Sequence, residues 1–344
     1  MEEYWLQEVK TLINIWFIAI TSICYCYFIP AHISHGIPRL LSLLPIITIF
    51  SILPLPISTV HLAFPTFFFL LWLGNFKLLL FAFNRGPLSS KPSLPFVTFI
   101  SIALFPINPK QHSNNKLLPY SATKSFLLVL KLTIFAEIVH VYPFKDNLHW
   151  SVVVILYFTH MYIGFEFGFA LTALFVKFLH GYDFELDPHF NEPYLATSIQ
   201  DLWGRRWNLM SSSILRATVY NPLRTMLVPS LGKFRAQLVG IFVTFVVSGL
   251  MHELMYYYLM RVPPTWEVTW FFVLHGVWTA VEVVVKKAVK GRFSLPRAVS
   301  WPLTLAFLVL TGWLFFIQPI RNGVDAKIIS EHSILLKYLG LNQG

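Results

Sequence analysis

A histidine and a glutamate stand side by side in one of the most apolar stretches of this 344-residue chain. They are His252 and Glu253, within the run VSGLMHELMYYYL at 247–259. A charge at the centre of a membrane helix costs roughly 2.5–3.5 kcal/mol on insertion scales, so ionisable side chains there tend to be functional. Neutral histidine can take a proton near pH 7, and a positioned base accelerates a reaction about 10²–10⁴-fold. His252 is therefore the first candidate for a general base.

The neighbours of His252 at helical spacing are mostly small or aromatic. Ser248, Gly249 and Tyr256 lie on its side of the helix, at three- and four-residue spacings. Ser248 and Gly249 leave room for a ligand or a second helix, and all three are candidates for lining a chamber. Glu253 lies about 100° further round the helix and is expected to pair with an arginine or a tyrosine. The alternative for His252 is a structural histidine bonded to a neighbouring helix.

Metal chemistry is not favoured by the sequence. HELMY resembles the start of a zinc-protease HExxH helix, but Tyr256 occupies the position of the second histidine. The close pair His32 and His35 is too little for a di-iron site. The two cysteines, Cys24 and Cys26, cannot form a disulfide framework or a cysteine-based zinc site. We predict no metal site.

The second cluster is QDLWGRRWNLM at 200–210. Arg205 and Arg206 can bind phosphates bidentately, and Trp203 and Trp207 can anchor at a membrane interface. Asn208 follows Arg205 by three residues, so both can face one pocket. This combination suits an amphiphile with an anionic head, and an ordinary interfacial anchor is the alternative. A further candidate for lining the chamber is His275, which lies mid-span beside Gly276.

The composition shows what must position these residues. The chain is 56% hydrophobic and only 12% charged, whereas soluble domains are about 25% charged. It is therefore expected to be an all-α polytopic membrane protein. The net charge of +10 comes from basic loops between apolar runs, which is the pattern of cytosolic loops and does not indicate nucleic-acid binding. The acidic start MEEYWLQEVK does not resemble a secretory signal.

About eight transmembrane helices are expected, with seven to nine as the range, because each crossing needs about 20 apolar residues. The predicted spans are Leu12–Ile29, Leu40–Ile57, Val60–Phe83, Ser125–Tyr142, Trp150–Leu179, Ala236–Met260, Trp266–Val285 and Val299–Ile320. Leu94–Ile107 is short and bracketed by prolines, so it is expected to be re-entrant or interfacial. The polar section 181–233 is expected to be a loop followed by interfacial helices on the cytosolic face.

With eight spans, the three most basic loops fall on one side. The positive-inside rule makes that side cytosolic and places both termini on the opposite face. A transporter with proton-relay residues would be expected to show paired broken helices, but here the polar residues gather in one cluster and one helix. No Walker loop, GxGxxG or GxSxG motif occurs, which argues against nucleotide motors, nicotinamide enzymes and α/β-hydrolases.

Two longer segments carry a family resemblance. PYLATSIQDLWGRRWNLMSSSILRATVYNPLR (193–224) and TFVVSGLMHELMYYYLMR (244–261), with NFKLLLFAFNRGPLSS (75–90) upstream, resemble the plant wax synthases. These are long-chain-alcohol O-fatty-acyltransferases of the membrane-bound O-acyltransferase superfamily. The resemblance covers most of the chain and implies one transmembrane acyltransferase domain over 1–344, with a catalytic core at 181–290.

The resemblance also implies a reaction and a catalytic pair. The reaction is transfer of a fatty acyl group from acyl-CoA to a lipid alcohol, at the endoplasmic reticulum membrane with acyl-CoA entering from the cytosol. The pair is an intramembrane histidine, matched by His252, and a polar residue in the tryptophan-rich segment, matched by Asn208. No cofactor is implied beyond acyl-CoA as co-substrate. Relatives with similar motifs acylate sterols, so the acceptor remains open between a fatty alcohol and a sterol, and the oligomeric state is not indicated.

Overall fold

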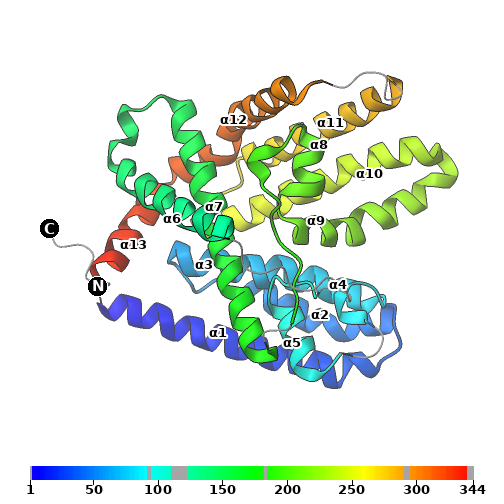
Figure 1. Ribbon diagram of the computed structural model, residues 1–344. Helices are drawn as coiled ribbons and strands as arrows, with labels where there is room; N and C mark the ends of the chain where they lie inside the picture. The colour runs from blue at the N-terminus through cyan, green and yellow to red at the C-terminus, as the bar shows by residue number, and fades with distance from the viewer. Residues whose placement is uncertain (1, 91–93, 110–121, 182–183, 290–294, 339–344) are drawn as a thin grey trace.

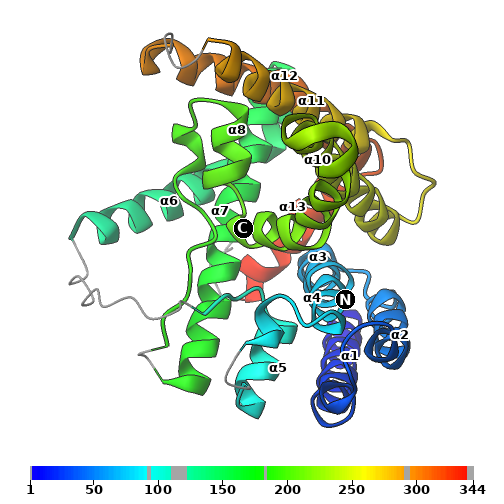
Figure 2. The same ribbon diagram turned by 90° about the vertical axis from the view of Figure 1, so that its right-hand side faces the viewer.

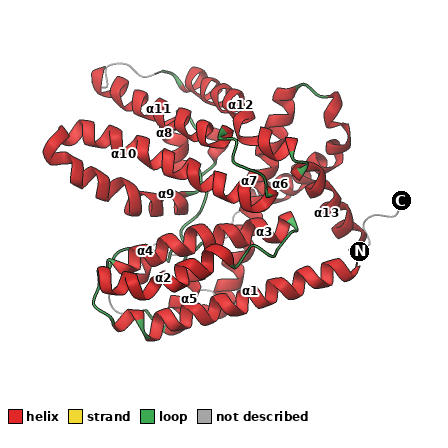
Figure 3. Cartoon of the chain, turned by 180° about the vertical axis from the view of Figure 1, so that it is seen from behind, coloured by secondary structure: helices red, strands yellow, loops and turns green. Residues whose placement is uncertain are grey.

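The computed structural model describes residues 2–90, 94–109, 122–181, 184–289 and 295–338. Within these ranges the secondary structure is helical, apart from one isolated bridge between Pro109 and Leu186 (Figures 1 and 3). The α-helices are α1 (Glu2–Phe28), α2 (Ile37–Ile52), α3 (Val60–Thr66), α4 (Asn75–Ala82), α5 (Phe96–Leu104), α6 (Ala122–Val141), α7 (Trp150–His180), α8 (Ile199–Asp201), α9 (Leu209–Leu215), α10 (Asn221–Met260), α11 (Glu267–Ala288), α12 (Arg297–Arg321) and α13 (Val324–Tyr338).

Seven helical stretches in the described part of the chain are long and apolar enough to cross a membrane. They are Glu3–His32, Val60–Ala82, Phe126–Asn147, Trp150–His180, Leu209–Met260, Glu267–Ala288 and Arg297–Arg321. The expected class, an all-α polytopic membrane protein with seven to nine spans, is confirmed.

The central estimate of eight included Leu40–Ile57, which the structure shortens. The helix there is α2, which ends at Ile52 just before Pro54 and has only 16 residues. Leu53, the C-cap, still has helical geometry, but Pro54 has no backbone N–H to continue the helical hydrogen bonds, which explains the early end. At 1.5 Å per residue α2 is about 24 Å long, less than the roughly 30 Å hydrocarbon core. The predicted short segment Leu94–Ile107 contains α5, whose nine residues cannot cross.

Val60–Ala82 is continuous but not uniformly α-helical. Its middle, η2 (Phe67–Gly74), is a π-helical stretch in which all eight residues are buried. π-Helical turns are rare and occur frequently at functional sites. Two more follow in the polar section, at η6 (Leu202–Arg206) and η7 (Arg216–Tyr220).

The 52-residue stretch Leu209–Met260 is a helical hairpin rather than a single crossing. A straight helix of that length would extend about 78 Å, far beyond a bilayer core. Gly232 breaks it with φ 75° and ψ 162°. A Cβ on Gly240 would lie 3.0 Å from the Tyr220 ring, so the two arms pack side by side (Figure 1). Residues 209–231, which the sequence suggested would be interfacial, thus form a long arm packed against the helix of His252.

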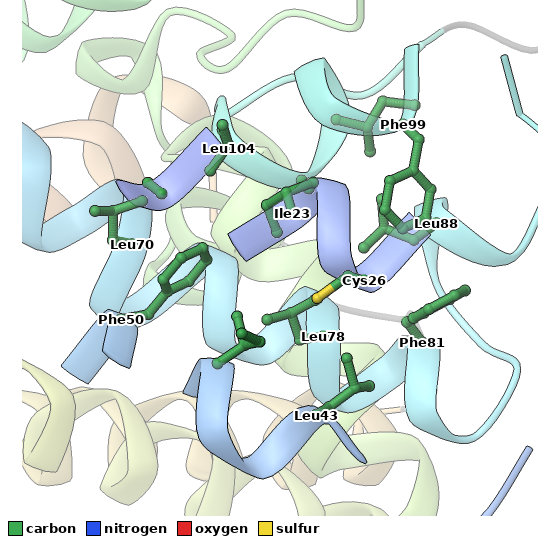
Figure 4. Close-up of a cluster of buried hydrophobic side chains, with 14 of the residues drawn as sticks. Ile23, Cys26, Leu43, Phe50, Leu70, Leu78, Phe81, Leu88, Phe99 and Leu104 are labelled. Atoms are coloured by element: carbon green, nitrogen blue, oxygen red, sulfur yellow. The ribbon is translucent and has the colours of Figure 1, made fainter. Parts of the chain in front are cut away.

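The helices form two layers, which we call the N-terminal layer (α1–α5) and the C-terminal layer (α8–α12), with α7 running beside both (Figures 1 and 2). The core of the N-terminal layer is a cluster of close-packed side chains from α1, α2, α4, α5 and η2 (Figure 4). A second apolar cluster joins α7, α10, α11 and α12. A third lies between the layers, where η2 meets α7, α9 and α10.

The basic loops gather at one end of the molecule. The end of α4, the hairpin turn at Gly232 and the end of α11 lie at the right of Figure 1, opposite the start of α1 and α13. Arg85, Lys233, Lys286 and Lys287 belong to that basic end. This agrees with the expected grouping of the basic loops on one side of the membrane.

Candidate active site

His252 has a hydrogen bond that fixes its protonation. Its Nδ1 lies 2.7 Å from the carbonyl oxygen of Ser248, one turn earlier in α10. A carbonyl only accepts hydrogen bonds, so Nδ1 carries the proton and Nε2 of the neutral ring keeps a lone pair. No hydrogen-bond partner of Nε2 occurs among the described residues. This is the tautomer that a general base acting through Nε2 requires.

Aromatic rings from three other elements surround the His252 imidazole. The ring centroid of Phe272 (α11) lies 4.3 Å away, that of Trp72 (η2) 5.0 Å and that of Phe315 (α12) 5.8 Å. The imidazole is therefore held in an apolar cage and still keeps some accessible surface. The indole N–H of Trp72 is buried and has no hydrogen-bond partner in the described structure. A buried donor without a partner is rare in proteins, and here it lies beside the candidate base.

Asn208 is the N-cap of α9 and has a left-handed backbone, with φ 38° and ψ 63°. Asparagine tolerates this conformation better than most residues. Its side-chain oxygen accepts a hydrogen bond from the backbone N–H of Ser211, at 3.2 Å. The cap uses the oxygen, so the amide NH₂ group remains as the available donor.

Asn208 and His252 stand near the two ends of the helical hairpin that turns at Gly232. The close approach of Tyr220 to Gly240 aligns the two antiparallel arms. Asn208 lies 12 residues before Tyr220, and His252 lies 12 residues after Gly240. Met210 and Met251, two residues beyond Asn208 and one before His252, pack in the same apolar cluster between the layers. The backbone next to Asn208 and the backbone next to His252 therefore border one apolar cluster.

Glu253 has a structural environment different from that of His252. It is 3% exposed, and its Oε1 accepts from the backbone N–H and the hydroxyl of Thr269, both at 3.4 Å. Thr269 lies in the first turn of α11, where backbone N–H groups lack helical partners and favour a negative charge. The expected partner was an arginine or a tyrosine. The observed partner is the amino-terminal end of the next helix.

Trp203 and His275 form a direct contact that the sequence did not suggest. The indole N–H of Trp203 donates to Nδ1 of His275 at 2.8 Å. Nε2 of His275 lies 2.8 Å from the hydroxyl of Thr311 in α12. His275 is fully buried with both nitrogens bonded, so it lies inside the packing between α11 and α12 and not on an open surface.

The two adjacent arginines have different environments. The Arg206 Nε atom bonds to Asp201 at 2.6 Å, and its Nη1 donates to the carbonyls of Asn191 and Glu192. Arg206 therefore holds the segment together. Arg205 is exposed and faces a pocket of about 540 Å³. The residues that line it are Ser198, Gln200, Asp201, Gly204, Arg205, Arg216 and Lys286.

The pocket is cationic. Asp201 pairs with Arg206, and Lys286 lies 3.4 Å from Glu282. Arg205 and Arg216 therefore supply the positive charge that has no acidic partner among the described residues. Lys286 also donates to Gln200 at 2.7 Å. The volume falls in the ordinary range of small-molecule sites, and the two arginines suit a ligand with several phosphate oxygens.

The remaining candidates have packing roles in the structure. Trp207 packs against Phe190 and Trp203. Tyr256 donates to the carbonyl of Phe315 at 2.9 Å. A Cβ on Gly249 would lie 3.0 Å from the Cα of Thr269, so this glycine makes room for α11. Ser248 is buried and supplies the carbonyl that orients His252.

Sequence reasoning missed the buried Lys77. It is 0% exposed, and its ammonium donates to the carbonyls of Ile102 and Phe105 at the carboxyl end of α5, at 2.6 Å each. Lysine satisfies the last carbonyls of a helix well. The signal was a lysine within the apolar run FLLWLGNFKLLL at 69–80, the one charged residue of that run.

His189 also went unnoticed, in the loop before the tryptophan-rich segment. Its carbonyl accepts from the backbone N–H of Leu209, directly after Asn208. Burial lowers the pKa of His189 to about 4, helped by the charge of Lys77 and opposed by a hydrogen bond to the Pro106 carbonyl. The ring is therefore neutral at physiological pH. A single loop histidine gives no periodic signal, so its burial could not be predicted.

Known proteins resemble this chain over nearly its whole length. Residues 186–274 match the family model described as membrane bound O-acyl transferase family. A long-chain-alcohol O-fatty-acyltransferase of Simmondsia chinensis is 49% identical over 341 residues, which are 96% of each chain. A probable long-chain-alcohol O-fatty-acyltransferase 1 of Arabidopsis thaliana is 43% identical over 336 residues, 96% of this chain and 97% of the relative.

A relative with a different acceptor in its name is nearly as similar. Acyl-CoA–sterol O-acyltransferase 1 of Arabidopsis thaliana is 42% identical over 334 residues, 94% of this chain and 95% of the relative. The similarity to all three proteins includes the hairpin, the tryptophan-rich segment and both helical layers.

Proposed function

This chain belongs to the membrane-bound O-acyltransferase family, and we propose that it transfers a fatty acyl group from acyl-CoA to a long-chain alcohol to form a wax ester. The observation that carries the proposal is the 49% identity over 96% of the chain to a long-chain-alcohol O-fatty-acyltransferase. The Nε2 lone pair of His252, the amide donor of Asn208 and the cationic pocket support the same reaction.

His252 acts as the general base in this proposal. Its free Nε2 takes the proton of the alcohol as the alcohol oxygen attacks the thioester carbonyl. The resulting tetrahedral oxyanion collapses, the carbon–sulfur bond breaks, and the imidazolium returns the proton to the CoA thiolate. The aromatic cage limits water near the base, which suppresses hydrolysis of the thioester.

Asn208 supplies a donor for the oxyanion. Its oxygen is occupied by the cap of α9, so its NH₂ group is the part that faces a substrate. One preorganised donor to an oxyanion contributes about 3–4 kcal/mol. The unpartnered indole N–H of Trp72 is a second donor beside the base.

The cationic pocket takes the phosphates of CoA. Arg205 and Arg216 provide the charge, whereas Arg206 is engaged by Asp201. The reaction needs no cofactor, because the thioester supplies an activated acyl group and the alcohol supplies the nucleophile. The basic end of the molecule supports acyl-CoA binding from the cytosol, at the endoplasmic reticulum membrane.

A sterol is the second candidate acceptor, favoured by the 42% identity to an acyl-CoA–sterol O-acyltransferase. To test this, the protein is expressed in a yeast strain that lacks its own neutral-lipid acyltransferases. The strain is supplied with fatty alcohols, and the lipid esters that it forms are profiled. Wax esters are the expected product. Steryl esters alone would move the assignment to the second candidate, and no ester of either kind would reject both.

The same strain tests the base. His252→Ala should abolish ester formation at unchanged protein level, because no other group with a free lone pair lies in the cage among the described residues. His149→Ala, at the exposed start of α7, is the matched control and should keep full turnover. Ester formation by His252→Ala at the normal rate would remove His252 from the mechanism.

A further inference from the structure

A chain of hydrogen bonds crosses the C-terminal layer behind the candidate base. Trp203 Nε1 donates to His275 Nδ1, and His275 Nε2 bonds to the Thr311 hydroxyl, each at 2.8 Å. The Thr311 hydroxyl in turn lies 2.8 Å from the carbonyl of Phe307. The three side chains come from the tryptophan-rich segment, α11 and α12.

The direction of every bond in this chain is fixed by its two ends. Indole N–H can only donate, so Nδ1 of His275 must be the acceptor and Nε2 must carry the proton. Thr311 accepts from that Nε2–H and donates its own proton to the Phe307 carbonyl, which can only accept. These hydrogen bonds are all made, and His275 and Thr311 are buried, so the network holds the half-buried Trp203 ring in one orientation.

Trp203 connects the two halves of the candidate site. On its outer side, Gly204 and Arg205 of the same turn line the cationic pocket. On its inner side, the Trp203 ring packs on Phe272 with centroids 5.6 Å apart, and Phe272 packs on His252 at 4.3 Å. Displacement of the indole would therefore reach the base through one intervening ring.

We propose that His275 is a positioning residue which, through Trp203 and Phe272, fixes the orientation of the His252 imidazole relative to the cationic pocket. This role rests on the proposed acyltransferase function. Neither His275 nor Thr311 contacts substrate in this proposal. They affect the orientation of the His252 imidazole, so substituting them should lower kcat more than it changes the KM for acyl-CoA.

Substitutions that remove or keep the hydrogen bonds separate this role from general packing. Trp203→Phe keeps a ring but removes the donor, and His275→Leu removes both nitrogens. Each should lower kcat about 10- to 100-fold, the range that a small misplacement of a catalytic group produces. His275→Gln keeps one acceptor and one donor and should retain most of the activity. Turnover and KM are to be measured on detergent-purified protein, normalised to the monodisperse fraction.

A double substitution tests whether the residues act as one unit. Trp203→Phe combined with His275→Leu should be no slower than the slower single variant, because the same bond is lost in both. Thr304→Val is the matched control for Thr311→Val, since Thr304 is buried in α12 but bonds only to a carbonyl of its own helix. It should leave kcat unchanged, whereas Thr311→Val should lower it.

The possible outcomes separate the two proposals. Active wild-type protein with full kcat in Trp203→Phe would overturn the positioning role and leave the acyltransferase intact. Equal losses in His275→Gln and His275→Leu, or strictly additive losses in the double variant, would also overturn it. Wild-type protein that forms no ester would reject the proposed function and the positioning role together.

Discussion

At the scale of single residues, adjacent side chains of one type divide into different roles. Arg205 and Arg206 look equivalent in the sequence and were predicted to bind the same phosphates. The structure ties Arg206 to Asp201 and to two backbone carbonyls and leaves Arg205 facing the pocket. The sequence does not show this difference, because the difference depends on the side of the π-helical turn η6 from which each arginine side chain projects.

The two arginines therefore give opposite expectations. Arg205→Gln should raise the KM for acyl-CoA about tenfold, the loss of one charge-assisted contact of roughly 1.5 kcal/mol, with a normal melting temperature. Arg206→Gln should instead leave the Asp201 carboxylate unpaired and lower the unfolding free energy by about 1–3 kcal/mol. Kinetics and thermal melting of both variants check this. A KM effect confined to Arg206 would assign the phosphates to that residue.

Asn208 allows the cap to be separated from the donor. Asp at this position can still cap α9 through a carboxylate oxygen but has no NH₂ group. Asn208→Asp should therefore keep its melting temperature and lose about 10²–10³-fold in kcat, the effect of removing one oxyanion donor. Asn208→Ala, which loses the cap as well, should melt earlier. Normal turnover in Asn208→Asp would limit Asn208 to a structural role.

At the scale of elements, three glutamates accept hydrogen bonds from the first N–H groups of other helices. Glu282 accepts from the N–H groups of Ile199 and Gln200 at α8. Glu331 accepts from the N–H groups of Val60 and His61 at α3, and Glu253 does so at α11. Carboxylates stabilise helix starts. These acidic residues in apolar runs are thus explained by helix ends that cannot reach water.

Most elements could be predicted from apolar run length, but their ends and pairing could not. The prolines after Ile52 shorten α2, and Gly232 folds a long apolar stretch back on itself. Hydropathy does not register the break at Pro54, which lies between two leucines, and at Gly232 one glycine beside Lys233 does not show that the chain turns back on itself. The pairing of Asn208 with His252 was expected from family resemblance alone. It stays a prediction, and the structure adds that Met210 and Met251, neighbours of the two residues in the sequence, pack in the same apolar cluster.

The contact between α10 and α11 predicts a steric effect on catalysis. A Cβ on Gly249 would meet the Cα of Thr269 at 3.0 Å and the Cβ of Phe272 at 3.3 Å, so Gly249→Ala must push α11 outward. Because Phe272 stacks on His252, kcat should fall at least tenfold. Gly164→Ala in α7, with nothing within 4 Å, is the control and should be neutral or stabilising by up to about 1 kcal/mol. Similar kinetics in the two variants would contradict the close packing.

At the scale of the whole molecule, α13 closes the end opposite the basic loops. Its Glu331 and His332 both reach His61, where α3 starts: Glu331 at 2.5 Å, and His332 through a 2.9 Å contact between the two Nε2 atoms. Asp325 accepts a hydrogen bond from Tyr157 of α7 at 2.9 Å. The last described helix thereby joins the N-terminal layer to α7.

The contacts of α13 with α3 should stabilise the protein less in acid. Burial, with the nearby His61, lowers the pKa of His332 to about 4. Below about pH 6.5 the histidine is protonated in the unfolded chain but stays neutral in the folded protein, so the free energy of unfolding falls as the pH is lowered. Burial raises the pKa of Glu331, but hydrogen bonds from the His61 side chain and from backbone N–H groups outweigh it, and the net pKa is lowered. The Glu331 contribution is present above the ordinary carboxyl pKa and is lost as pH falls through the lowered value. Both groups therefore contribute less stability as the pH falls.

Thermal melting in detergent should show the effect as a fall in melting temperature between pH 6.5 and 4. His332→Phe keeps a ring but cannot titrate, so its melting temperature should depend less on pH in that window. His35→Phe, at an exposed loop position, is the control and should follow the wild-type curve. Parallel curves for wild type and His332→Phe would exclude His332 as the source of acid sensitivity.

The hairpin that turns at Gly232 has a consequence for how the protein is made. Asn208 and His252 are 44 positions apart, at the two ends of one helical unit that folds back at Gly232. Contacts within such a unit are local and form quickly, and chain segments assemble in the order in which they are synthesised. The unit that carries both catalytic candidates can therefore fold while α11 and α12 are still on the ribosome. The order of translation would then give the nascent chain its reacting pair first, and the rings that enclose it from Phe272 and Phe315 last.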